Sequence, residues 1–261
     1  MKTIKLILYF WKLNLFSAME YRVSFMIQVF SMIINDVFFF LIWVFLFKIF
    51  WTIWWLKIWE FMILLSIMIM VFWISHTFFN WYYRISEMIE EWKLDSYMLL
   101  PKNLLLRILT SSMNISAIWD IIYALLLMLL IPNISILLIL KIIIYATIWS
   151  FTFIWFMLIF CSLSFFMWSS RNMLRWAMEG ILWPSHYPPW IFEWSFLKYI
   201  FMTIIPVYFV VWWWFELVMN FDFFLLLKLI FWSSIFVFLW FSTFYYWLKK
   251  YESWNMININ T

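Results

Sequence analysis

Residues 84–101 read RISEMIEEWKLDSYMLLP and form the longest polar run in a chain of 261 residues. The chain as a whole is 69% hydrophobic and only 11% charged. Charged side chains within the run are Arg84, Glu87, Glu90, Glu91, Lys93 and Asp95. Because long apolar runs lie on both sides, these charges must contact water or a soluble partner rather than lipid. The run therefore predicts a loop that divides the chain into membrane-spanning segments.

The apolar residues of the same run recur at helical spacing, on one face of a helix. They are Ile85, Met88, Ile89 and Trp92. Asp95 is placed to cap a second short helix over residues 96–100, which Pro101 ends. The run thus predicts two short amphipathic helices with a break near Trp92. Two interpretations stay open: a solvated loop between two spans, or a docking element for a cytoplasmic protein.

Composition decides the broad class of protein. Ordinary soluble domains are about 45–50% apolar and about 25% charged, so this chain is predicted to be an integral membrane protein. Its length suits about six spans of ~20 residues plus loops, with no room for a separate soluble domain. The net charge of +4 is spread over several loops and indicates membrane orientation rather than nucleic-acid binding. The single cysteine, Cys161, excludes an internal disulfide and a cysteine-based metal site.

Apolar runs predict spans over residues 25–47, 58–82, 115–131, 135–168 and 223–247. Residues 1–22 carry lysines on one narrow face, which is typical of an interfacial helix or of an ordinary cytoplasmic start to the first span. Two topologies remain for the segment before the last span. In one, residues 172–186 form a short fifth span and residues 196–218 are re-entrant, broken at Pro206. In the other, residues 169–195 stay in the cytoplasm and residues 196–218 form the fifth span.

Orientation follows from the distribution of lysine and arginine. Twelve of them fall on one side: Lys2, Lys5, Lys12, Arg22, Arg84, Lys93, Lys102, Arg107, Arg171, Arg175, Lys249 and Lys250. The positive-inside rule makes this side cytoplasmic. Both termini and residues 84–101 are then expected in the cytoplasm. The turns at Pro132-Asn133 and Tyr187-Pro188-Pro189 are expected outside.

The string WKLDSYMLLP, from Trp92 to Pro101, resembles the loop between the second and third spans of ABC type-2 exporter permeases. The resemblance is to the multidrug-type branch that works with a separate ATPase subunit. Trp92 stands where that family has glycine. Further matches follow along almost the whole chain: Glu20-Tyr21-Arg22, Tyr187-Pro188, Ile191-Phe192, Ile205-Pro206 and Tyr251-Glu252-Ser253.

This resemblance implies an all-α integral membrane protein of the plasma membrane, with about six transmembrane helices, an N-terminal interfacial helix and a re-entrant outer segment before the last span. It favours residues 172–186 as the fifth span. It also implies a cytoplasmic ABC ATPase subunit and a second permease subunit, in a homo- or heterodimer, as partners within the lipid bilayer. The residues of the ATPase-coupling loop, 84–101, would be Arg84, Glu87, Glu90, Glu91, Trp92, Leu94, Asp95, Leu99 and Pro101.

Sequence motifs for catalysis are absent from the chain. It has no phosphate-binding loop of the form G-x-x-x-x-G-K-[ST], even when every tryptophan is read as glycine, so it is not expected to hydrolyse ATP alone. It has no H-E-x-x-H or G-x-S-x-G motif, and its two histidines, His76 and His186, do not predict a zinc site or a catalytic triad. Together with these absences, the resemblance implies a transporter subunit without cofactor or metal. A mostly apolar interior would suit export of a lipophilic or amphipathic substrate.

Two acidic residues, Asp36 and Asp120, lie inside predicted spans. An acid at that depth costs roughly 2.5–3.5 kcal/mol on insertion scales, so each should face protein or a water-filled cavity. Both are candidates for lining a translocation path or for pairing helices. Two further functions remain open on these residues, a proton-coupled secondary transporter and an intramembrane enzyme. The sequence does not indicate whether the two side chains meet.

The ratio of tryptophan to glycine is unusual, at 24 to 1. Some bacteria read UGA as glycine, whereas a common alternative translation table reads it as tryptophan. Several tryptophans fall in apparent turns, which favour glycine: Trp54, Trp55, Trp92, Trp183, Trp190 and Trp194. A tryptophan belt at the membrane interfaces is the competing explanation, but it does not account for tryptophans inside the spans, namely Trp43, Trp73, Trp119, Trp155 and Trp240. Our hypothesis is that most tryptophans mark glycine positions.

Overall fold

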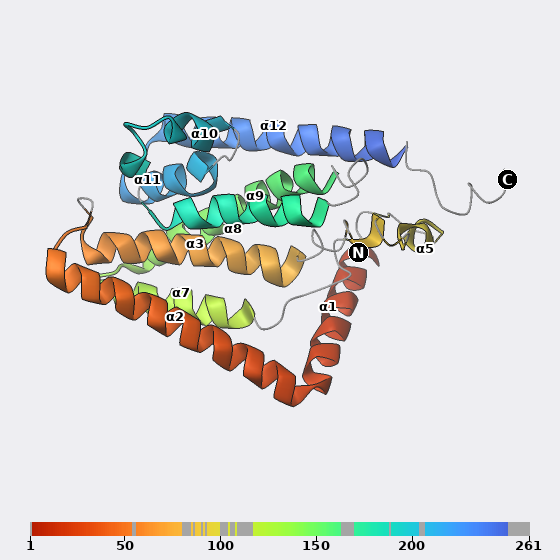
Figure 1. The fold of residues 1–261 in the computed structure, drawn as a ribbon, viewed down its shortest axis with the longest axis horizontal. Helices are drawn as coiled ribbons and strands as arrows, with labels where there is room; N and C mark the ends of the chain where they lie inside the picture. The colour runs from red at the N-terminus through yellow and green to blue at the C-terminus, as the bar shows by residue number, and fades with distance from the viewer. Residues whose placement is uncertain are drawn as a thin grey trace.

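The computed structural model describes residues 2–53, 56–79, 85, 87–89, 91, 93–99, 104, 108, 117–162, 170–187, 189–203 and 207–249. Within these residues the regular elements are helices, and one isolated bridge pairs Ile53 with Leu56 (Figure 1). The helices are α1 (Lys2–Glu20), α2 (Arg22–Phe50), α3 (Ile58–Phe79), α5 (Leu94–Met98), α7 (Ile118–Leu129), α8 (Ile136–Ser162), α9 (Ser170–Ser185), η3 (Pro189–Ile191), α10 (Leu197–Thr203), η4 (Tyr208–Trp212), α11 (Trp213–Met219) and α12 (Phe223–Leu248). The predicted all-helical class is confirmed for the described part of the chain.

Four of the described helices are long and apolar enough to cross a membrane: α2, α3, α8 and α12. They match the predicted spans 25–47, 58–82, 135–168 and 223–247, although residues 80–84 and 163–169 lie outside the described residues. The other two predicted spans are shorter helices. At 1.5 Å per residue, α7 with 12 residues and α9 with 16 reach about 18 and 24 Å, less than the ~30 Å of a bilayer core. The count of six spans stays a prediction.

The segment before the last long helix is bent. Helix α10 and the continuous stretch from η4 through α11 meet at 69°, across residues 204–206, which lie outside the described residues. A bend of this size is that of a broken span or of a re-entrant segment. Both alternatives for residues 196–218, a re-entrant segment and a fifth span, therefore stay predictions, and a fifth span here would be a broken one.

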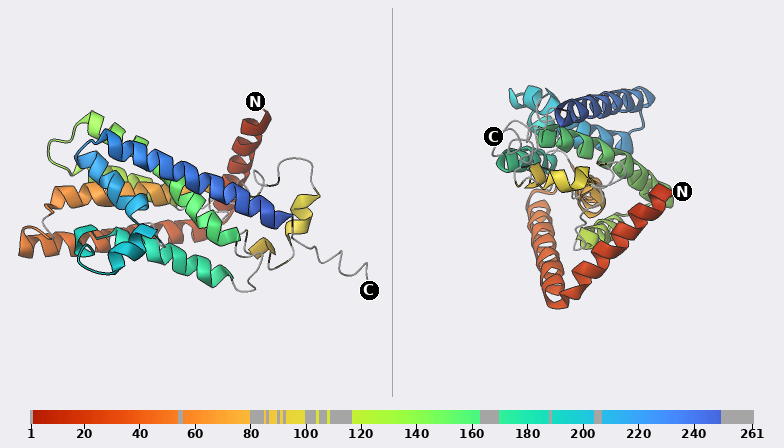
Figure 2. Two further views of the ribbon diagram at one scale, coloured as in Figure 1. Left: turned by 90° about the horizontal axis from the view of Figure 1, so that it is seen from above. Right: turned by 90° about the vertical axis from the view of Figure 1, so that its right-hand side faces the viewer.

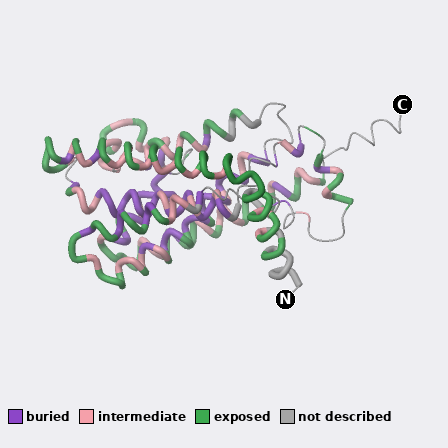
Figure 3. The backbone as a smooth tube through the Cα atoms, turned by 90° about the horizontal axis from the view of Figure 1, so that it is seen from below, coloured by how far each residue is buried: buried purple, intermediate pink, exposed green. Residues whose placement is uncertain are grey.

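Helix α3 forms the centre of the bundle. It packs against α7 on one side and α8 on another, and α8 packs in turn against α12. Small residues allow close approach of α3 and α7: the Ser66 hydroxyl donates to the carbonyl oxygen of Met62 at 2.7 Å and also lies 3.5 Å from that of Ala124 on α7. Figure 3 shows buried residues concentrated in the middle of the bundle.

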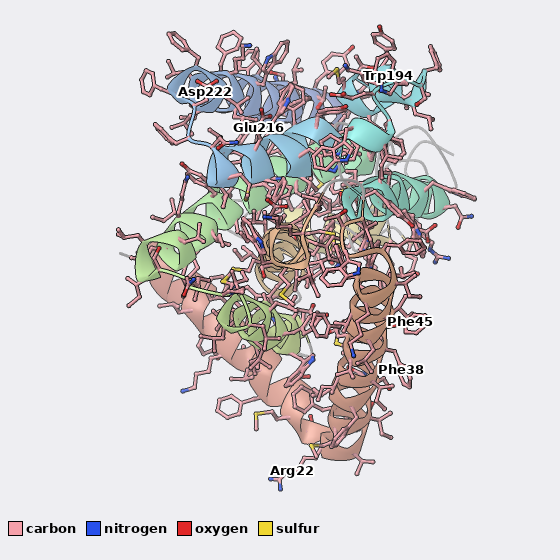
Figure 4. All side chains as sticks on the ribbon, turned by 90° about the vertical axis from the view of Figure 1, so that its left-hand side faces the viewer. Arg22, Phe38, Phe45, Trp194, Glu216 and Asp222 are labelled. Atoms are coloured by element: carbon pink, nitrogen blue, oxygen red, sulfur yellow. The ribbon has the colours of Figure 1, made fainter. Side chains whose placement is uncertain are left out.

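Helices α2 and α12 lie at the periphery and expose most of their apolar side chains. Figure 4 shows Phe38 and Phe45 of α2 pointing away from the other helices. Both side chains are more than half exposed. Helix α1 runs across the long axis of the bundle rather than along it in both views (Figures 1 and 2). This direction agrees with the predicted interfacial helix, because a span would run along the bundle.

The bundle has two distinct ends (Figure 1). The α5 end carries α5 together with the C-terminal ends of α3, α8 and α12. The α11 end carries the α2–α3 link, the turn from α7 to α8, and the segment from α10 to α11. The turns predicted on the outer side of the membrane therefore gather at one end, and the predicted coupling loop lies at the other.

Candidate functional site

The predicted coupling loop has a packed underside. Ile85, Met88 and Ile89 are buried, with 1%, 4% and 8% of their surface exposed. Leu94, the first residue of α5, is 1% exposed and belongs to the same apolar core as α3 and α8. The periodicity seen in the sequence is thus confirmed for these described residues, and their burial ties the loop to the membrane-length helices.

The charges of this loop partly compensate one another. The Lys93 ammonium lies 2.5 Å from a carboxylate oxygen of Glu91 and 3.9 Å from one of Glu87. The three side chains are between 39% and 59% exposed, so each pair contributes at most about 1 kcal/mol to stability. A cluster of this kind does not hold the fold together, and its charges stay accessible to a partner.

The prediction that Asp95 caps the second helix is wrong. Helix α5 begins at Leu94, its N-cap is Lys93, and no side chain makes the capping hydrogen bond. Asp95 lies within the first turn, where a carboxylate favours the helix dipole. The helix starts two residues before the predicted range, and Ser96 lies within its first turns, where its hydroxyl donates to the Lys93 carbonyl oxygen at 2.7 Å.

The end of α5 presents apolar side chains to the surroundings. Leu99 is 85% exposed and Met98 is 47% exposed. Four of the nine residues assigned to the coupling loop, Arg84, Glu90, Trp92 and Pro101, lie outside the described residues, as do Ser86 and Leu100. Among those described, the arrangement is a short amphipathic element with a buried anchor, an ion-paired cluster and an exposed apolar tip.

The two intramembrane acids belong to neighbouring helices. Helices α2 and α7 pack against each other, and the carboxylate of Asp36 on α2 interacts electrostatically with Asp120 on α7. The Tyr123 hydroxyl of α7 donates to the backbone carbonyl oxygen of Asp36 at 3.2 Å. The Asn35 side chain is hydrogen-bonded to Asp36, whereas one Asp36 carboxylate oxygen is buried without a hydrogen-bond partner in the described part of the chain. The structure therefore brings together two acids that the sequence left unrelated.

Tyr123 was missed by sequence reasoning. Its position three residues after Asp120 places both on one face of α7, which is the signal that could have found it. The histidines do not join this site, because His76 and His186 each hydrogen-bond a carbonyl of their own helix, Phe72 at 2.9 Å and Leu182 at 2.7 Å. No group of three or more histidine, cysteine, aspartate or glutamate residues in the described ranges could hold a metal ion.

Comparisons of the chain with protein-family models, curated proteins and solved structures find no match. The resemblance carried by residues 92–101 therefore stays a prediction. Function must be argued from the geometry of the α5 loop and of the acid pair between α2 and α7.

Proposed function

We propose that the chain is the permease subunit of an ABC type-2 exporter, and that a separate ATPase subunit docks on residues 84–101. One observation supports this most directly. An amphipathic charged loop lies at one end of a bundle of membrane-length helices, with its underside buried in the bundle and its tip exposed.

The burial of the loop supports a coupling role rather than that of a solvated connection. Leu94 and Ile85 pack into the same core as α3 and α8. Close-packed interiors transmit displacement instead of absorbing it. A movement imposed on α5 by a nucleotide-driven partner would then reach the central helix α3. A loosely solvated loop would dissipate that movement.

The exposed groups suit a protein partner. Leu99 and Met98 supply apolar surface, and Glu87 and Glu91 supply accessible carboxylates. Protein interfaces combine apolar anchors with a polar rim in this way. In this proposal the α5 end faces the cytoplasm, and two permease subunits together form the path for a lipophilic or amphipathic substrate.

The proposal is tested by charge reversal in a reconstituted complex. Changing Glu87, Glu90 and Glu91 to lysine should leave membrane insertion intact, but uncouple ATP hydrolysis from transport. Glu20→Lys, at the exposed C-terminal end of α1, is the matched control. The proposal fails if the triple variant binds and stimulates the ATPase as the parent does.

A second candidate function is favoured by the acid pair. Asp36 and Asp120 on adjacent helices, with Tyr123 beside them, form the kind of intramembrane cluster that carries protons in secondary transporters or acts in an intramembrane enzyme. Transport by Asp120→Asn distinguishes the candidates. The proton-coupled transporter would be favoured by two results together. The Asp120→Asn variant would lose transport, and transport by the parent chain would depend on the proton gradient and persist without ATP.

A further inference from the structure

A cavity of about 470 Å³ opens at the α11 end of the bundle, opposite the α5 loop. Four separate segments line it: the start of α3, the stretch from η3 to Glu193, helix α10, and the segment from η4 to α11. Figure 4 looks at this end and shows Glu216 on α11. The volume lies within the range of about 300–1,000 Å³ that small-molecule sites occupy.

The cavity has an excess of negative charge. Glu60, Glu193 and Glu216 line it, against the single ammonium of Lys198. The Glu60 carboxylate is held in place, because it accepts a hydrogen bond from the Lys57 backbone N–H at 2.8 Å. Glu193 and Glu216 form no ion pair with any residue that the structure describes. Two carboxylates are therefore available to a cation.

A second and independent observation comes from Tyr208, which also lines the cavity. Its side chain is only 4% exposed, and its hydroxyl has no hydrogen-bond partner in the described part of the chain. Buried polar groups are almost always hydrogen-bonded, because an unpaired one costs about 1–3 kcal/mol. A ligand atom in the cavity would satisfy it.

We infer that this cavity binds a monovalent organic cation with an apolar body, which deepens the proposed function by naming the substrate class. Glu193 and Glu216 neutralise the charge, the rings of Tyr208 and Phe215 present aromatic surface to it, and the Tyr208 hydroxyl bonds a polar atom of the ligand. A metal ion does not suit the site, since no group of three acidic residues in the described ranges lies close enough to hold one.

Tryptophans also line the cavity, but its charge comes from none of them. Trp190, Trp212 and Trp213 are among the positions where glycine is the alternative residue. Glycine there would enlarge the cavity and leave its carboxylates in place, whereas Tyr208, whose ring centroid lies 4.6 Å from that of Trp212, would become more exposed. The charge of the site therefore does not depend on how these codons are read.

The test uses the full chain in detergent, without an ATPase, and fluorescence anisotropy of rhodamine 6G, an apolar cation. Its free acid, in which a carboxylate replaces the ethyl ester, has the same ring system without net charge. The cation should bind at least tenfold more tightly than the free acid. Raising the salt concentration should weaken its binding, because charges near water are screened. Equal affinity for the two dyes would overturn the inference.

Variants separate specific binding from partition into detergent. The double change Glu193→Gln and Glu216→Gln should weaken rhodamine 6G binding at least tenfold, and Tyr208→Phe should weaken it a few fold. Glu179→Gln, outside the cavity, should leave binding unchanged. Lys198→Gln should tighten binding, because it removes the one positive charge among the described residues that line the cavity; a misfolded variant could not produce this gain. Unchanged affinity in both the double variant and Lys198→Gln would refute the site.

The outcome is independent of the exporter proposal. Binding of the cation by the isolated chain, without any ATPase partner found for it, would support the site and count against the exporter. ATP-driven export by a complex whose permease does not bind rhodamine 6G would count against the site and leave the exporter standing.

Discussion

The backbone N–H of Trp51 donates a hydrogen bond to the carbonyl oxygen of Phe47 at 2.9 Å and closes the last turn of α2. Trp51 itself has φ of 53° and ψ of −45°, and the next residue, Thr52, bonds back to the Phe50 carbonyl. Turns with positive φ at the centre are strained for any residue with a side chain. Glycine is the residue that adopts a positive φ without a steric penalty from a side chain. Trp51 therefore adds a position to those that the sequence indicates as glycine.

Replacing Trp51 by glycine should raise the free energy of unfolding by about 1 kcal/mol, because the left-handed backbone penalty of about 1–2 kcal/mol is removed. Little burial is lost, since the ring is 87% exposed. Unfolding by sodium dodecyl sulfate in mixed micelles measures the change. Trp176→Gly is the matched control: this ring is 74% exposed, but it lies inside α9, where glycine should cost about 0.5–1 kcal/mol. Destabilisation by both changes would contradict the assignment at Trp51.

Reading the gene tests the glycine hypothesis as a whole. UGA codons are expected at Trp51, Trp92 and most other tryptophan positions, and the intact mass of protein from the native host should fall below 32.8 kDa. Trp149 and Trp212 also support the hypothesis, because the indole N–H of each is buried without a hydrogen-bond partner in the described part of the chain. Buried tryptophans usually have such a partner. UGG codons at these positions would end the hypothesis.

Two leucines of the coupling loop should behave in opposite ways when changed to alanine. Leu94→Ala should destabilise the chain by about 2–5 kcal/mol, since it removes a buried side chain. Leu99→Ala should change stability by less than about 0.5 kcal/mol, because the side chain is exposed. If an ATPase subunit docks on this loop as proposed, Leu99→Ala should reduce its recovery in co-purification at least tenfold. Full recovery with Leu99→Ala would remove this side chain from the proposed docking surface.

Tyr123→Phe should lower the free energy of unfolding by about 0.5–1.5 kcal/mol, because the hydrogen bond to the Asp36 carbonyl oxygen is lost. Tyr199→Phe, at an exposed position, should have almost no effect. The same detergent unfolding measurement compares the two. An equal effect of the two changes would show that this hydrogen bond between α7 and α2 contributes nothing to stability.

Labelling with an impermeant thiol reagent tests orientation in cells, in a Cys161→Ala background. Cysteine at Pro132 or Pro189 should react in intact cells, whereas cysteine at Leu99 should react only after permeabilisation. Pro132 is preferable to Asn133, whose φ of 54° would strain a cysteine. Reaction at position 189 only in permeabilised cells would place the loop after α9 in the cytoplasm.

Part of the coupling loop was predictable from local pattern. The spacing of Ile85, Met88 and Ile89 predicted the buried face, because residues three and four apart share one side of a helix. The start of α5 was placed too late, since a Ser or Asp near a helix start can cap it or lie inside its first turn. The proximity of Asp36 and Asp120 could not be predicted, because they are 84 positions apart in the sequence and only the packing of α2 against α7 sets their distance.

The sequence alone determined the helical class and the four long apolar helices, because a chain in lipid must satisfy its backbone hydrogen bonds within each segment. Tertiary structure alone decided which of these helices forms the core. Helices α2 and α3 are similarly apolar, yet 67% of the most apolar stretch of α3 is buried against only 6% for α2. Lipid and protein interiors are equally apolar, so hydropathy cannot distinguish them. Small residues such as Ser66 and Ala124 lead to burial of a helix only where another helix packs against them. That contact exists only in the folded chain.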